Sequence, residues 1–217
     1  MKAIEKFWTW FQNNEQELKN ALLLGIRREE VLLQLSKKVY LISRRIGYVI
    51  KFPETDDDLF VFIFTGGGYR KLFPKLLAFE ELAPKLDYFK VQAFIKPMEN
   101  REEVLLGTDR PIVFHHYGFK VSELRFSLLD FNVKAKQLKL TVFLDDYDAL
   151  QEFEQLRHDV QTVLIDVIGE IKYRKHIKDF ELAPLPINDN GLVPLIELEE
   201  CIDYLYVINS RKKTRVI

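Results

Sequence analysis

The stretch Leu59-Phe60-Val61-Phe62-Ile63-Phe64 is apolar at every position and is followed, after Thr65, by three consecutive glycines at positions 66–68. A strand that is apolar on both faces is typical of the middle of a sheet, where neighbouring layers cover both sides. The glycines predict a turn directly after the strand, because glycine reaches backbone conformations that other residues avoid. We therefore expect residues 59–64 to form the central strand of the fold.

Strand patterns continue on both sides of this segment. Residues 48–52 and 88–95 are each predicted to form a strand, and the polar stretch 53–58 predicts a turn before the central strand. After the glycines, Pro74 suits the first turn of a helix, which we expect to reach Leu82. Short links between neighbouring strands require antiparallel pairing.

The second half of the chain carries four further strand patterns. In one of them the apolar residues Leu138, Leu140 and Val142 alternate with polar ones, which predicts that one face of the strand meets water. A hairpin is expected at 132–136, and the polar residues 98–110 are interpreted as a long connection. The four strands are expected at 112–117, 124–132, 138–144 and 171–180.

Two helices are predicted before any strand. In residues 3–23 apolar side chains recur at helical spacing from Ile4 to Phe11, and Asn14 is expected to interrupt the pattern. Residues 28–43 form a second amphipathic pattern. We expect these two helices to pack as an extension on the main body.

A third helix, at 149–168, has the clearest apolar stripe in the chain. Asp148 is placed to cap its first turn, and Gln151 follows three residues later as in a capping box. Gly169 stands where a C-terminal cap glycine belongs. A last helix is predicted to begin near Pro194.

In this order, the elements predict an α+β fold. We expect an antiparallel-rich mixed sheet of about six strands, with helices packed on it and an N-terminal two-helix extension. A single domain is expected to span residues 1–217. Its parts are expected to be a helical extension at 1–45, a sheet-and-helix body at 46–185, and a C-terminal helix with a basic tail at 186–217.

The composition argues against several classes of partner. The chain has 32 basic and 33 acidic residues and a net charge of −1, so it has no overall field to attract nucleic acid or an anionic membrane. A single cysteine, Cys201, excludes a disulfide within the chain, and no apolar run approaches the ~20 residues that span a bilayer. We expect a cytoplasmic protein that binds neither nucleic acid nor membrane and has no cofactor.

Several short sequence patterns are found together in this chain. They are Phe7-Trp8-x-Trp10-Phe11-x-x-Asn14-Glu15, the glycines at 66–68, Phe73-Pro74 with Leu82-Ala83-Pro84, Phe89-x-Val91-x-Ala93-Phe94, and Ile168-Gly169-Glu170. With these patterns the chain resembles a family of uncharacterised bacterial proteins, a domain of unknown function with no assigned activity. The resemblance implies a shared fold and a bacterial origin, and it supplies no catalytic residues.

The glycine loop is the segment with the most suggestive chemistry. Gly66, Gly67 and Gly68 lie between a strand and a helix start, and Arg70 and Lys71 follow them. Free N–H groups at a helix start and nearby cations can hold a phosphate or a carboxylate. The spacing matches neither common nucleotide-binding glycine motif, so a turn that needs positive φ is the alternative interpretation.

The two adjacent histidines, His115 and His116, fall in a predicted strand. Successive strand residues point to opposite faces, so the two rings are not expected to share a metal ion. We expect one ring to enter the core and the other to face water. No metal site is predicted anywhere in the chain.

The remaining reactive side chains have structural interpretations. Asp145, Asp146 and Asp148 fall where a strand ends and a helix begins, where acidic residues cap free amides. Glu170 would suit a general acid or base, but no partner for it is evident. Cys201 is interpreted as a small buried hydrophobic residue.

The N-terminal helix carries a candidate interface. Trp10 is rotated away from the core stripe, and an exposed tryptophan is typical of an interface anchor. We therefore interpret the chain as a non-catalytic binding or protein-interaction module, with an unknown protein partner or a second copy of itself. The alternative is a small-ligand binding protein, or an enzyme, that uses the glycine loop at 66–71. Whether the chain is an enzyme stays open at this point.

Overall fold

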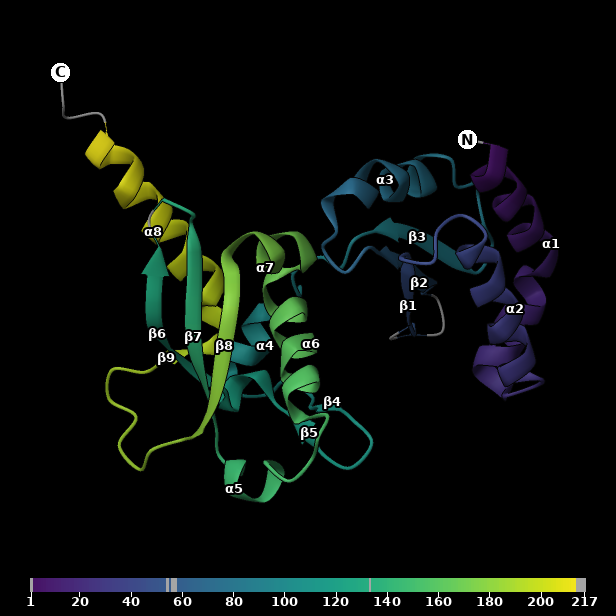
Figure 1. Ribbon diagram of the computed structural model, residues 1–217. Helices are drawn as coiled ribbons and strands as arrows, with labels where there is room; N and C mark the ends of the chain where they lie inside the picture. The colour runs from purple at the N-terminus through teal and green to yellow at the C-terminus, as the bar shows by residue number, and fades with distance from the viewer. Residues whose placement is uncertain (1, 54, 56–57, 133, 214–217) are drawn as a thin grey trace. The chain divides into compact units, whose positions relative to one another are not determined.

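The computed structural model describes residues 2–53, 55, 58–132 and 134–213 (Figure 1). The chain divides into two compact units, residues 1–95 and residues 96–217. The expectation of a single domain with parts at 1–45, 46–185 and 186–217 stays a prediction. Each unit has its own hydrophobic core.

The first unit consists of helices around a three-stranded sheet. In the sheet order β1-β2-β3, β2 is central, pairs antiparallel with β1 and parallel with β3, and confirms the strand predicted at 59–64. The elements are α1 (Lys2–Leu24), α2 (Arg28–Tyr40), β1 (Gly47–Lys51), β2 (Phe60–Thr65), the 3-10 turn η1 (Arg70–Leu72), α3 (Phe73–Glu81) and β3 (Phe89–Ala93).

Aromatic side chains fill the core of the first unit. The ring of Phe64 on β2 stacks on Phe79 of α3 with centroids 4.1 Å apart, and Phe7 of α1 meets both rings edge-on. The buried indole N–H of Trp8 donates to the carbonyl oxygen of Phe79 over 3.0 Å. Such edge-to-face and offset contacts add to the free energy gained by burying the rings.

Helices α1 and α2 pack together, as the two-helix prediction required. The predicted interruption at Asn14 is wrong, because α1 is continuous from Lys2 to Leu24. The Asn14 side-chain amide donates to the carbonyl oxygen of Trp10, one turn earlier, over 2.7 Å. This bond along the helix lets asparagine stay inside it rather than cap a new one.

The second unit is built on a four-stranded sheet of order β8-β7-β6-β9 (Figure 1). Strands β6 and β7 form the expected hairpin, and β8 is parallel to β7. The elements are α4 (Arg101–Leu106), β4 (Ile112–Val113), β5 (Gly118–Phe119), η2 (Val121–Glu123), β6 (Arg125–Asn132), β7 (Gln137–Leu144), α5 (Tyr147–Leu150), α6 (Leu156–Ile168), α7 (Glu170–His176), β8 (Ile177–Pro184), β9 (Val193–Pro194), η3 (Leu195–Glu197) and α8 (Leu198–Lys213).

One face of this sheet forms the core of the second unit. Leu138, Leu140 and Val142 of β7 are buried, and the residues between them are half-buried, which confirms the predicted alternation. Val160 of α6 and Ile202 of α8 belong to the same core cluster. The period of two on β7 therefore separates the helix-covered face from the more accessible one.

The α+β class and the antiparallel-rich pairing are confirmed, but the strands do not join into one sheet of about six. Within the described residues they form three sheets: β1-β2-β3, β4-β5 and β8-β7-β6-β9. The larger two each contain one parallel pair, β2 with β3 and β7 with β8. The β1-β2-β3 sheet contributes to one core and the β8-β7-β6-β9 sheet to the other, and Phe119 of β5 belongs to this second core.

The helix predicted at 149–168 is wrong in its first half. The chain forms the short α5 (Tyr147–Leu150), leaves the helix, and begins α6 at Leu156. Asp148 lies inside α5 and caps nothing, while Asp146 stands at the cap position without a side-chain cap bond. In the sequence, Phe153 continues the apolar stripe of the predicted helix. In the structure it lies outside both helices, and its ring contacts His116 and Tyr117.

Three other predicted elements are also corrected. The connection at 98–110 contains α4, and the strand predicted at 112–117 is reduced to the two residues of β4. The strand predicted at 171–180 begins as α7, in which Glu170, Tyr173 and His176 are buried at helical spacing. The β-branched and aromatic residues of this segment favour a strand, but the spacing of the buried residues is that of a helix.

Gly169 ends α6 as predicted and gives a stability test. It adopts φ +77° and ψ 150°, and an added Cβ would lie 2.8 Å from Pro97 Cδ. Gly169→Ala should lower the free energy of unfolding by about 2–5 kcal/mol, because it adds strain and overlap together. Gly107→Ala is the matched control, since Gly107 has φ +71° and open space, so only about 1 kcal/mol should be lost. Equal losses in urea unfolding would contradict this account.

His176 gives a pH test of the second core. Its ring is buried with Nδ1 3.1 Å from the carbonyl oxygen of Lys136, and burial lowers the pKa of His176 below its ordinary value of 6.5. The folded state therefore binds the proton less readily than the unfolded state. Stability from this group is complete above about pH 6.5 and is lost as pH falls through the folded pKa. In urea titrations, His176→Gln should flatten that decline, and an unchanged slope would contradict the assignment.

Candidate functional site

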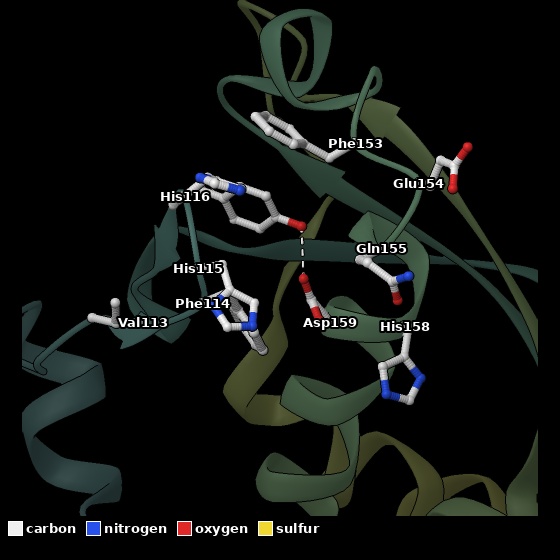
Figure 2. A pocket seen from close by; sticks show the side chains of 10 residues that line it. Val113, Phe114, His115, His116, Phe153, Glu154, Gln155, His158 and Asp159 are labelled. Carbon is white, nitrogen blue, oxygen red and sulfur yellow. Dashed lines mark hydrogen bonds between the residues drawn. The ribbon is translucent and has the colours of Figure 1, made fainter.

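A hollow of about 840 Å³ lies in the second unit, between the β4–β5 hairpin and the start of α6 (Figure 2). Residues 113–117 of the hairpin form one side, and residues 153–155 form the other together with His158 and Asp159. The two sides are 36 or more residues apart in sequence, so only the fold brings them together. Pockets of this size suit small ligands.

A hydrogen bond joins the two sides of the hollow. The Tyr117 hydroxyl donates to Oδ2 of Asp159 over 2.7 Å, shown by the dashed line in Figure 2. Burial, and then this bond to the carboxylate, raise the pKa of Tyr117 to about 12. The phenol therefore remains a proton donor to Asp159 at neutral pH, and the hairpin is tied to α6.

Aromatic rings from the two sides of the hollow contact one another. The Phe153 ring stacks on His116 with centroids 5.7 Å apart and an angle of 18° between the planes. It also lies 5.0 Å from the Tyr117 ring, at an angle of 55°. Phe153 is 37% exposed and lines the hollow. Flat rings of this kind favour another planar group as a neighbour.

Three of the four histidines of the chain line the hollow. His115 and His116 occupy the turn between β4 and β5, with ring centroids 6.3 Å apart, and His158 lies across from them on α6 (Figure 2). Both hairpin rings are exposed, so the prediction that one enters the core is wrong. A turn does not alternate its side chains between two faces, and the prediction had assumed a strand.

The side chains do not form a metal centre. Across the residues that the structure describes, no three side chains of His, Cys, Asp or Glu gather in a way that could hold a metal ion. What the hollow offers is apolar ring surface, imidazole nitrogens that can donate or accept hydrogen bonds, the amide of Gln155 and the carboxylates of Glu154 and Asp159. This combination suits a planar ligand with a polar edge.

The glycine loop predicted as a ligand site belongs to the first unit. Gly67 and Gly68 adopt φ of +53° and +74°, as the interpretation of the segment as a turn required. Gly66 is buried against Leu76 and Leu72, whose side chains would lie 3.2–3.4 Å from an added Cβ. Arg70 and Lys71 are exposed in η1, before the first turn of α3.

The predicted interface residue, Trp10, is partly covered by its own unit. Its ring lies 6.3 Å from that of Phe7, and Lys38 Nζ of α2 lies 5.5 Å from its centroid. These contacts fit an aromatic ring that joins α1 to α2 with an ammonium group above it. Its role in an interface stays a prediction.

The other reactive side chains have structural surroundings. Glu170 begins α7 and is buried at 1% exposure. Cys201 is half-buried on α8, and burial raises the pKa of its thiol, which keeps the sulfur protonated. These surroundings agree with the interpretation of Cys201 as a small apolar residue rather than a nucleophile.

Sequence reasoning missed most of the hollow. Tyr117, Phe153, His158 and Asp159 were given no part in a binding site, because their meeting depends on the hairpin turn and on the break before α6. One signal was available: three histidines fall in two short segments of a chain that has only four.

Comparisons with known proteins give no further guide to this site. No protein-family model, curated protein or solved structure matches the chain. Of the helices among the described residues, none combines the length and the apolar character needed to cross a membrane.

The bond between Tyr117 and Asp159 can be tested by spectrophotometric titration of the tyrosines. In Asp159→Asn, the apparent pKa of Tyr117 should fall below about 12, because the carboxylate no longer favours the protonated phenol, while burial should keep it above its ordinary value of 10. Tyr117→Phe should remove this late-titrating tyrosine from the curve. An unchanged titration in Asp159→Asn would contradict the hydrogen bond.

Proposed function

We propose that the chain is a non-catalytic binding protein and that the hollow of the second unit is its binding site. The proposed ligand is a small planar group with a polar or anionic edge, either free or presented by a partner protein. The expected bacterial origin, cytoplasmic location and lack of a cofactor stay predictions beside it.

The observation that carries this proposal is the exposed aromatic wall. Phe153 stacks on His116 and contacts Tyr117, yet it is 37% exposed in a hollow of about 840 Å³. Exposed flat rings held in place by neighbours lose little conformational freedom on binding, so a planar ligand gains contact area at low entropic cost. Imidazole nitrogens at the rim then supply hydrogen-bond donors for its polar edge.

The arrangement of the acidic and basic groups supports binding over catalysis. The Asp159 carboxylate accepts from Tyr117, and no hydrogen bond in the described structure joins His115, His116 or His158 to a carboxylate. A histidine that acts as a general base is normally oriented by a second group. The hydrogen-bonded pair in the hollow, Tyr117 with Asp159, joins the hairpin to α6, and the histidines are left as recognition groups.

A protein partner or a second copy of the chain stays a proposal for the first unit. Trp10 of α1 is the residue predicted to anchor such an interface. It is half-buried, and the ammonium group of Lys38 lies over its ring. A partner at this surface would have to displace the lysine from the ring. The hollow requires no such rearrangement, so we place the principal binding site there.

Ligand binding at the hollow can be tested with simple aromatic acids. Indole-3-carboxylate and benzoate are titrated into the intact protein while the histidine ring protons are followed by NMR. The signals of His115, His116 and His158 should shift together with one dissociation constant. Phe153→Ala should weaken binding at least about tenfold, because the stacking surface is lost.

Phe52→Ala is the matched control for this experiment. Phe52 is 49% exposed in the first unit and contacts Phe60, so it is a comparable half-exposed ring away from the hollow. It should leave the affinity unchanged. Equal weakening by both substitutions, or titration of either acid without a shift of the three histidines, would overturn the proposed site.

A further inference from the structure

Basic residues are distributed very unevenly along the first unit. Residues 31–53 contain five basic side chains and no acidic one, and residues 59–79 contain three basic side chains and no acidic one. The whole chain, by contrast, has 32 basic and 33 acidic residues. The eight residues are Lys37, Lys38, Arg44, Arg45, Lys51, Arg70, Lys71 and Lys75.

The fold brings half of these cations to one end of a strand pair. Strand β1 begins at Gly47, which pairs with Thr65 at the end of β2. The turn before β1 carries Arg44 and Arg45, and the loop after β2 leads to Arg70 and Lys71. Two segments with no acidic residue therefore meet at the glycine loop.

A contact between side chains confirms that these two segments meet. The Arg45 guanidinium carbon lies 4.8 Å from the centroid of the Tyr69 ring, and Tyr69 precedes Arg70 directly. Tyr69 is 40% exposed, so the guanidinium rests on a ring at the surface. Stacking on an aromatic face holds an arginine fork in place while its N–H groups stay available to a ligand.

The four cations have no acidic partner that the structure describes. Arg44, Arg45, Arg70 and Lys71 are exposed and take part in none of the ion pairs formed by the described residues. The next acidic residue along the chain, Glu80, lies at the far end of α3. Like charges that are clustered without a counterion repel one another, and a bound anion removes that repulsion.

We infer that this surface, defined by Arg44, Arg45, Arg70 and Lys71 around the glycine loop, binds a small molecule that carries two or more linked phosphate groups. Arginine forks match phosphate oxygens in pairs of hydrogen bonds. Four cations on two adjacent segments also match the several negative charges of a polyphosphate better than the single charge of one carboxylate. The site lies in the first unit and does not depend on the proposed function of the hollow.

The inference is tested by calorimetric titration of the full chain with sodium tripolyphosphate at low and at raised salt. We expect saturable binding that weakens as salt rises, because exposed charges are screened. Arg70→Ala with Lys71→Ala, and separately Arg44→Ala with Arg45→Ala, should each weaken binding at least about tenfold. Lys71→Glu provides a second, single change with the same expected direction.

Lys85→Ala with Lys90→Ala is the matched control, because it removes two exposed positive charges from the same unit outside this surface. It should change the affinity less than about twofold, and thermal unfolding checks that every variant is folded. Equal weakening by the control pair would mean general charge attraction and overturn the site. Equal affinity for citrate would overturn the preference for phosphate. Tight binding of a single-stranded oligonucleotide with none of tripolyphosphate would overturn the small-molecule assignment.

Discussion

Each of the two units contains one pair of parallel neighbouring strands, and this pairing constrains the rest of the unit. Parallel strands cannot be joined by a tight turn, because the chain must return to the starting edge through a crossover, usually a helix. The crossover from β2 to β3 contains α3, and the one from β7 to β8 contains α5, α6 and α7. The apolar faces of these helices must then cover the sheet, so a core forms on each side of residue 95.

The same constraint explains where the two candidate sites lie. In sheets with parallel strands, the chain leaves the carboxyl end of a strand through a loop, and ligands often bind at such loops. The glycine loop follows Thr65 at the end of β2, and the segment with Phe153 follows β7 through α5. In both places the backbone is released from strand pairing before the crossover helix begins. Side chains there can be selected for chemistry rather than for sheet packing.

Local periodicity predicted most of the long elements but not α4 or α7, while the joints between elements required tertiary contacts. The apolar run 59–64 was identified as the central strand, and α1, α2, α3 and the β6–β7 hairpin were found near their true positions. The break before Leu156 was missed because Phe153 continues the helical stripe, and only its contact with His116 shows why it leaves the helix. The division into separate sheets could not be predicted either, because the apolar pattern of one strand does not show which other strand it pairs with.

The net charge of the whole chain does not show how charges are distributed locally on its surface. A net charge of −1 describes the field far from the molecule, where a balanced set of charges cancels. Within about one Debye length, ~8–10 Å under ordinary salt, only the nearest charges act on a ligand. Around the glycine loop these are Arg44, Arg45, Arg70 and Lys71, from two segments without an acidic residue. A net charge near zero therefore excludes long-range attraction to polyanions, but it is compatible with a local surface that binds an anion.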